Sequence, residues 1–212
     1  MKRKIIFLLI VSGVIIINSC KKDESKGDPA LEPISHNMDP YMFKTGTWWV
    51  YELAGTQTLD TVSITGTESG EFWSELAING SNGVKAAYYQ MGIKSSASNT
   101  TGNYYIAFDY MRKNGGGYYG EYGQPILFAG HTQGYGFGGA KIDTIMADFT
   151  VSGVPFFGVV KIKITSAEQY QTEYPKDTYL YFAPGFGLVR KDVVQDVGDV
   201  DIWLVKSWNI VN

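Results

Sequence analysis

Four aspartates cluster near the carboxyl end of the chain, in the stretch DVVQDVGDVD, and their carboxylates are the first candidate chemistry. Carboxylates at such spacing can bind Ca²⁺, although the ligand order of an EF-hand loop is absent. The alternative, which we favour, is a solvated hairpin turn around Gly198. Asp192 opens the stretch, and the candidate metal ligands are Asp196, Asp199 and Asp201. No bound cofactor is expected.

Histidine and cysteine are scarce, and this limits the catalytic chemistry that the chain can perform. The two histidines are His36 and His131, and a single cysteine makes a Cys₂His₂ zinc site impossible. A Ser-His-Asp triad would need His131, and no Gly-x-Ser-x-Gly motif presents a nucleophile. A pair of glycosidase carboxylates stays open, because their separation is spatial and is not encoded in spacing.

The segment GYGFGG at residues 134–139 matches the letters of a dinucleotide-binding loop. That loop needs a strand before it and a helix after it, so that the helix N-terminus meets the phosphate. Residues 140–149 favour an extended chain instead, which makes the match accidental. A mobile aromatic loop is the simpler interpretation. A sugar-stacking surface is the functional one, with Tyr135 and Phe137 as its platforms.

The only cysteine, Cys20, follows a cationic start and an apolar run of 13 residues at positions 5–17. Such a run spans about 20 Å as a helix, whereas a bilayer core is about 30 Å thick. It therefore predicts an export signal. The sequence INSC at residues 17–20 resembles a bacterial lipobox, which implies cleavage before Cys20 and its acylation. The alternative is an ordinary secretory signal with an incidental cysteine. We expect residues 1–19 to be a lipoprotein signal peptide and acylated Cys20 to bind the lipid bilayer.

The residues after Cys20 predict a tether and a localisation signal. The stretch KKDES at residues 21–25 resembles the tag that sends some Gram-negative lipoproteins to the outer face of the outer membrane; a plain solvated tether is the alternative. Prolines and few apolar residues make residues 20–40 a flexible spacer. Loss of Lys2, Arg3 and Lys4 with the signal changes the net charge from −3 to −3 − 3 = −6. An acidic protein is a poor partner for nucleic acid.

The remaining residues, 41–212, predict one antiparallel all-β domain with little helix beyond the signal peptide. No long window has helical periodicity, whereas strand patterns are frequent. Residues 160–165 (VKIKIT) alternate apolar and polar side chains, as in a sheet with one dry face. Residues 48–53 (WWVYEL) are aromatic and β-branched. The Asn-Gly pairs at residues 79–80 and 82–83 favour hairpin turns and hence a meander.

Two short motifs bracket this domain. FKTGTWWVY at residues 43–51 resembles the Gly-x-x-Trp-x-Tyr opening of many bacterial outer-membrane lipoproteins. APGFGLVR at residues 183–190 is similar to their Ala-Pro-Gly-Val-Gly-Leu-Val-Lys signature, with Phe186 and Arg190 as departures. The resemblance implies a curved antiparallel sheet, a half-barrel or open barrel like that of the lipoprotein carriers. It implies no activity.

The second motif has a physical explanation. Pro184 cannot donate a ladder hydrogen bond, and Gly185 and Gly187 permit backbone dihedrals closed to other residues. We therefore expect a sharp turn between two strands, in preference to a ligand loop. The functional expectation is a membrane-anchored, non-enzymatic protein that binds an apolar ligand, a glycan or a partner protein on its curved sheet. The alternatives are a glycan-processing enzyme or accessory protein, and a purely structural envelope protein.

Overall fold

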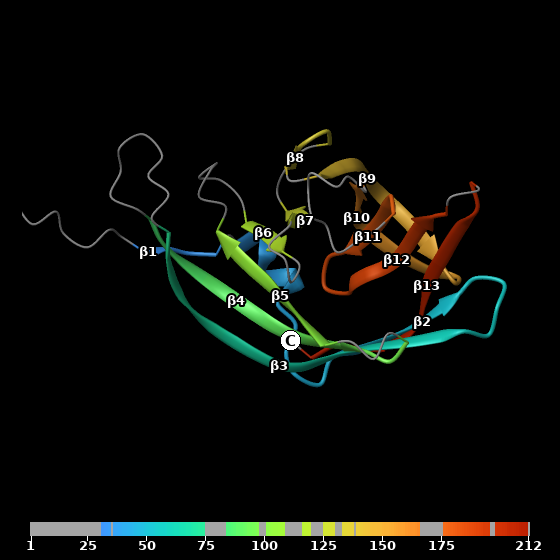
Figure 1. Ribbon diagram of the computed structural model, residues 1–212, viewed down its shortest axis with the longest axis horizontal. Helices are drawn as coiled ribbons and strands as arrows, with labels where there is room; N and C mark the ends of the chain where they lie inside the picture. Colours follow the sequence, from blue (N-terminus) through green and yellow to red (C-terminus); the bar gives the residue numbers. More distant parts are fainter. Residues whose placement is uncertain are drawn as a thin grey trace, which may run out of the picture.

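A computed structural model describes residues 31–34, 36–74, 84–97, 101–108, 116–119, 125–129, 133–137, 139–165, 176–195 and 198–211. In these residues the protein is all-β, with one antiparallel sheet curled into a half-barrel (Figure 1). This confirms the fold class expected from the sequence. The helical part of the described residues is a single 3-10 helix, η1. No helix of the described residues is long and apolar enough to cross a bilayer.

The elements follow one another along the chain almost entirely as strands. Their bounds are β1 (Leu31–Glu32), η1 (His36–Tyr41), β2 (Trp48–Leu53), β3 (Leu59–Ser74), β4 (Val84–Ser95), β5 (Thr101–Phe108), β6 (Gly116–Tyr119), β7 (Pro125–Ala129), β8 (Gly136–Phe137), β9 (Ala140–Val151), β10 (Val154–Ile164), β11 (Thr178–Ala183), β12 (Gly187–Val194) and β13 (Val200–Asn209).

Two meanders make up the sheet. The strand order is β7-β6-β5-β4-β3-β2-β13-β12-β11-β10-β9-β8, so each half runs in chain order and β2 joins them by pairing with β13. Trp49 and Trp208 face each other across this junction. The sheet curls until β7, near one end, contacts β9 and β10 near the other. In Figure 1 the long β3 and β4 form one wall and β9–β13 the opposite wall.

The strand pattern of the sequence explains which face of β10 is dry. Ile162 and Ile164 are fully buried, whereas Lys161 and Lys163, which alternate with them, keep part of their side chains in solvent. β2 has the bounds that its aromatic run predicted. The Asn-Gly pairs between β3 and β4 lie outside the described residues, which resume at Val84.

Residues 31–34 and 36–40 belong to the segment that the sequence assigned to the flexible tether, and both stretches include residues that contact the sheet. β1 pairs in parallel with β4, and η1 contacts β6. Met38 on η1 is 0% exposed and Tyr41 is 3% exposed, so both belong to the core. η1 therefore includes Tyr41, the residue at which the sequence placed the start of the domain. Met38 is buried by packing inside the curled sheet, which local composition does not reveal.

The turn between β11 and β12 packs against β2. Residues 184–186 form the turn, as the Pro-Gly-x-Gly pattern predicted, and Gly187 starts β12 with a φ of +82°. A Cβ on Gly187 would lie 3.1 Å from Cε2 of Phe43 and 3.2 Å from Cζ2 of Trp49. Glycine is needed at this position for two reasons: it adopts the positive φ without strain, and it leaves room for the two aromatic rings.

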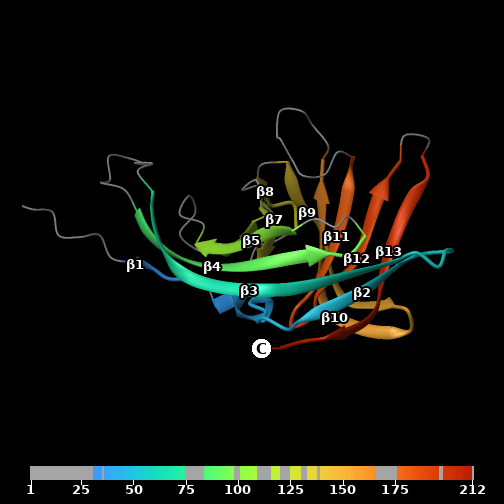
Figure 2. The same ribbon diagram turned by 60° about the horizontal axis from the view of Figure 1, so that its bottom comes forward.

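The far half of the β9–β10 hairpin folds back over the neighbouring strands. Ser152 at its tip donates a side-chain hydrogen bond to the carbonyl of Val205 on β13 (3.3 Å). Phe156 packs edge-on against Phe186 and lies 6.0 Å from the ring of Trp208. In Figure 2 this part of β10 lies below the sheet formed by β2 and β13. The hairpin adds a second layer over the centre of the sheet.

Candidate functional site

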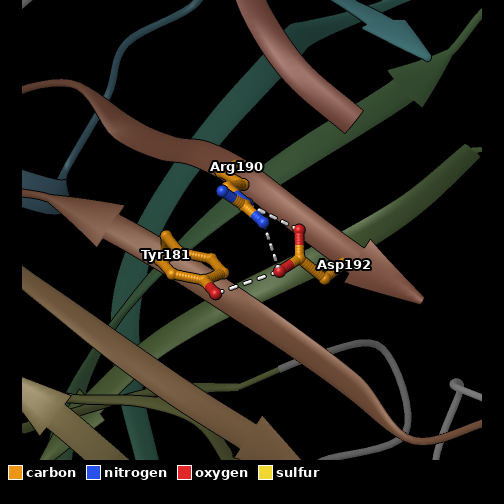
Figure 3. Close-up of polar contacts among 3 residues, drawn as sticks. All are labelled: Tyr181, Arg190 and Asp192. Atoms are coloured by element: carbon orange, nitrogen blue, oxygen red, sulfur yellow. Dashed lines mark hydrogen bonds and ion pairs between the residues drawn. The ribbon is translucent and has the colours of Figure 1, made fainter. Parts of the chain in front are cut away.

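The most highly organised polar group of the described residues joins Tyr181 on β11 to Arg190 and Asp192 on β12 (Figure 3). Arg190 and Tyr181 are register partners, and Asp192 follows two residues later on the same face. Leu180 and Val189 alternate with them and are buried in the core. The three polar side chains therefore lie on the face of the sheet opposite Leu180.

Asp192 is the centre of this group. Nε of Arg190 donates to Oδ1 of Asp192 at 2.7 Å, and Nη2 donates to Oδ2 at 2.9 Å. The hydroxyl of Tyr181 donates to the same Oδ2 at 3.0 Å. The carboxylate is buried, and a bidentate guanidinium is the strongest side-chain partner that it can have.

Burial and this hydrogen bonding shift the proton affinities of the group. Burial, with a smaller contribution from Asp192, raises the pKa of Tyr181 well above its usual range. The hydrogen bond that Arg190 donates to Asp192 raises the pKa of Arg190, against the opposing effect of burial. Phe149 stacks on Tyr181 with ring centroids 5.1 Å apart and an interplanar angle of 9°. The hairpin thus covers the Tyr181 ring and helps to desolvate it.

A second row of paired charges lies beside this group, nearer to solvent. Nζ of Lys161 is 2.7 Å from Asp143 and lies over the ring of Tyr179, 4.4 Å from its centroid. Lys163 pairs with Asp177 at 3.2 Å, and this hydrogen bond raises the pKa of Lys163. We call the whole set the paired-charge face: Asp143, Lys161, Lys163, Asp177, Tyr179, Tyr181, Arg190 and Asp192.

The paired-charge face has the chemistry of a hydrogen-bonding surface. Its three cations are matched by three carboxylates, so its formal charge sums to zero. Asp192 already accepts three hydrogen bonds, which leaves it poorly suited to act as a general base. Lys161, Lys163, Asp143 and Asp177 are half-exposed and present donors and acceptors side by side.

The three described aspartates of the cluster, Asp192, Asp199 and Asp201, do not gather around one point. Asp201 pairs in register with Val193, so its side chain lies on the opposite face of the sheet from Asp192. Asp201 instead accepts a hydrogen bond from the side chain of Gln195, and the backbone of Asp199 accepts one from Gln195 N. These contacts form the hairpin turn at Gly198. Asp196 lies outside the described residues. Within the described part, no three His, Cys, Asp or Glu side chains form a metal-binding group.

The other sequence candidates have different outcomes. Tyr135 is half-buried and packs against the core. The Phe137 side chain, like His131 and Cys20, lies outside the described residues. The GxGxxG letters are followed by strand β9, so the phosphate-binding arrangement is absent there. His36 is exposed on η1 and lies 3.2 Å from Asp39.

Sequence reasoning did not single out Tyr181, Lys161 or Arg190 as site residues. The available signal was the alternation itself: Lys161 and Lys163 occupy the wet face of β10, and the i, i+2 tyrosines of β11 pair with them. Arg190 was noticed only as a departure from a motif. Recognising the group required the register of three strands.

Comparison of the chain with protein-family models, curated proteins and solved structures found no match. The paired-charge face must therefore be interpreted from its own geometry.

Proposed function

We propose that this protein is a lipid-anchored, non-enzymatic binding protein of the bacterial outer membrane, and that its ligand is a neutral glycan of the cell envelope. The ligand binds on the paired-charge face. The anchor is Cys20, acylated after removal of residues 1–19. The observation that carries the binding proposal is the row of matched ion pairs and tyrosines along β10, β11 and β12.

The filled inner side of the half-barrel favours the opposite face as the binding surface. Met38 and Tyr41 of η1 lie inside the curl, together with fully buried Ile162 and Leu180. An apolar ligand would have to displace this packing. A ligand on the paired-charge face would meet half-exposed polar groups that are already in place.

Charge balance favours a neutral, hydroxyl-rich ligand. With three cations matched to three carboxylates, and Lys141 as the exposed register partner of Lys163, the face carries an excess of only one positive charge. Sugar hydroxyls both donate and accept, so they can bridge a lysine and its partner aspartate. The lysine and aspartate side chains are held in place by their mutual ion pairs, which lowers the conformational entropy that they lose when a ligand binds.

A purely structural role in the envelope is the second candidate. It is favoured by the hydrogen bonds of Asp192. Those that it accepts from Tyr181 and Arg190 suffice to explain why its carboxylate is buried. A structural protein would need no free donors on this surface. The two roles differ in whether purified envelope glycans bind.

Two experiments test the proposal. Metabolic labelling with a fatty acid should label the wild-type protein and should fail with Cys20→Ala; continued labelling of that variant contradicts the anchor. Calorimetric titration of the full chain with neutral polysaccharide fragments of the envelope should give saturable binding that changes little between low and high salt. Absence of binding to every fragment supports the structural role instead.

A further inference from the structure

Phe149 on β9 covers an aromatic ring of the proposed binding surface. Its ring is almost parallel to that of Tyr181 on β11, with an interplanar angle of 9° and centroids 5.1 Å apart. Tyr181 belongs to the paired-charge face, yet it is only 7% exposed. The flat face of this tyrosine is therefore occupied by a side chain of the β9–β10 hairpin, on a surface that otherwise presents polar groups.

The surroundings of the Tyr181 ring suit the stacking of a sugar. Two cations lie close to it: Cζ of Arg190 is 5.1 Å from the ring centroid, and Nζ of Lys161 is 5.7 Å from it. Each cation has a carboxylate beside it, at Asp192 and Asp143. A pyranose that stacked its C–H face on the tyrosine would therefore place its hydroxyls among donors and acceptors. The ring of the hairpin phenylalanine takes that position in the free protein.

The hairpin is held on the protein by residues other than Phe149. Phe156, its cross-strand partner, is 1% exposed, and Val151 is 3% exposed, so both belong to the core. Oγ of Ser152 at the tip donates a hydrogen bond to the carbonyl of Val205. Phe149 itself is only half-buried. A change of its side-chain rotamer would move the ring towards solvent while the hairpin backbone stays in place.

We propose that Tyr181 is the stacking platform for a pyranose ring of the glycan, and that Phe149 is an autoinhibitory cover that the sugar displaces when it binds. This inference rests on the proposed glycan binding; it adds the ring that holds the sugar and the side chain that competes with it. The exchange replaces one stacked ring by another, so the Arg190–Asp192 pair stays covered in both states. The apparent affinity equals that of the uncovered protein multiplied by the fraction of molecules that are uncovered.

The test compares the affinities of the full chain and its variants by calorimetric titration. The probes are neutral tetrasaccharides of β-linked glucose and of β-linked N-acetylglucosamine, whose rings expose broad C–H faces. Phe149→Ala removes the cover, and it should bind about threefold to tenfold more tightly than the wild type, because one aromatic stack no longer competes. Phe157→Ala is the matched control, since Phe157 lies on the same hairpin, is 66% exposed and should leave the affinity unchanged.

Two substitutions of Tyr181 test the platform itself. Tyr181→Leu removes the aromatic ring and should lower the affinity by about tenfold or more, whereas Tyr181→Phe keeps the ring and should bind within about threefold of the wild type. Circular dichroism establishes that each variant is folded. If Tyr181→Leu does not fold, the comparison of Phe149→Ala with Phe157→Ala still decides whether the cover competes with the sugar.

The outcomes separate this inference from the function on which it rests. If the wild type binds a probe and Phe149→Ala binds it equally well or more weakly, the autoinhibitory contact is overturned and the proposed glycan binding stands. Unchanged binding by folded Tyr181→Leu overturns the platform. If neither the wild type nor Phe149→Ala binds either probe, the proposed glycan binding is contradicted, and the inference with it.

Discussion

The indole N–H of Trp49 on β2 donates a hydrogen bond of 2.6 Å to the backbone carbonyl of Phe186, which is 137 residues away in the turn before β12. Tyr51 makes the matching contact two residues later, from its hydroxyl to the carbonyl of Leu188 at 2.7 Å. The two sequence motifs that bracket the domain therefore bind each other directly. Their residues are explained by the closure of the sheet around β2 and β13.

Gly187 should be the least replaceable residue of this contact. Gly187→Ala places a methyl group at a positive φ and against the rings of Phe43 and Trp49, so we expect a loss of about 2–4 kcal/mol in the free energy of unfolding. The control is Gly185→Ala, which has a similar φ of +77° but no atom within 4 Å of the new carbon. It should cost about 1 kcal/mol. Equal losses in urea denaturation would contradict this packing.

Met38 tests whether the segment before β2 belongs to the folded domain. Met38→Ala should lower the free energy of unfolding by about 2–5 kcal/mol, because it opens a cavity at a fully buried site. Leu31→Ala, at a side chain that is 41% exposed, should change it by less than about 1 kcal/mol. If Met38→Ala leaves the thermal and urea unfolding midpoints unchanged, η1 is not packed in the core and its residues belong to the tether.

Arg190 should contribute to stability mainly by neutralising Asp192. Arg190→Met leaves a buried carboxylate without its cation, and we expect a loss of about 2–4 kcal/mol, less than for a fully buried pair because Arg190 is partly exposed. The double variant Arg190→Met/Asp192→Leu should recover part of that loss. Lys206→Met is the control, since its pair with Glu52 is more exposed and should contribute less than about 1 kcal/mol. A double variant no more stable than Arg190→Met would refute this explanation.

The buried tyrosines predict instability in alkali. Burial raises the pKa values of Tyr41, Tyr51 and Tyr181 in the folded protein. An unfolded tyrosine ionises near pH 10, so above that pH the unfolded state loses protons that the folded state retains. Stability should be unaffected by these groups below about pH 10 and should fall above it, by up to about 1.4 kcal/mol per pH unit for each tyrosine. Urea midpoints measured from pH 8 to pH 11 check this, and Tyr51→Phe should reduce the slope. A slope unchanged by that variant would argue against the assignment.

Local sequence patterns predict where strands lie, but they do not predict which strands pair. The aromatic run of β2 and the alternation in β10 specify strands because side chains alternate between a dry and a wet face. The junction of β2 with β13 joins residues far apart in the chain, which no local pattern encodes. η1 was missed because one buried methionine among prolines and polar residues has no periodicity.

The candidate site was accessible to sequence reasoning only in fragments. Asp192 was seen among the acidic residues, but its partners lie on a different strand and two positions back on its own. Register shifts in β9–β10 and β11–β12 decide which side chains meet. A shift of one residue would place Tyr181 on the opposite face.

The most direct test of glycan binding on the paired-charge face compares two lysine variants of the full chain. Lys161→Met/Lys163→Met removes both lysines of the paired-charge face that lie next to Tyr179, whereas Lys206→Met removes a paired surface lysine on β13. Calorimetric titration with the fragment that binds the wild-type protein best should show at least a tenfold loss of affinity for the double variant and no change for the control. Equal affinity of the double variant and the wild type would contradict a binding function of the paired-charge face.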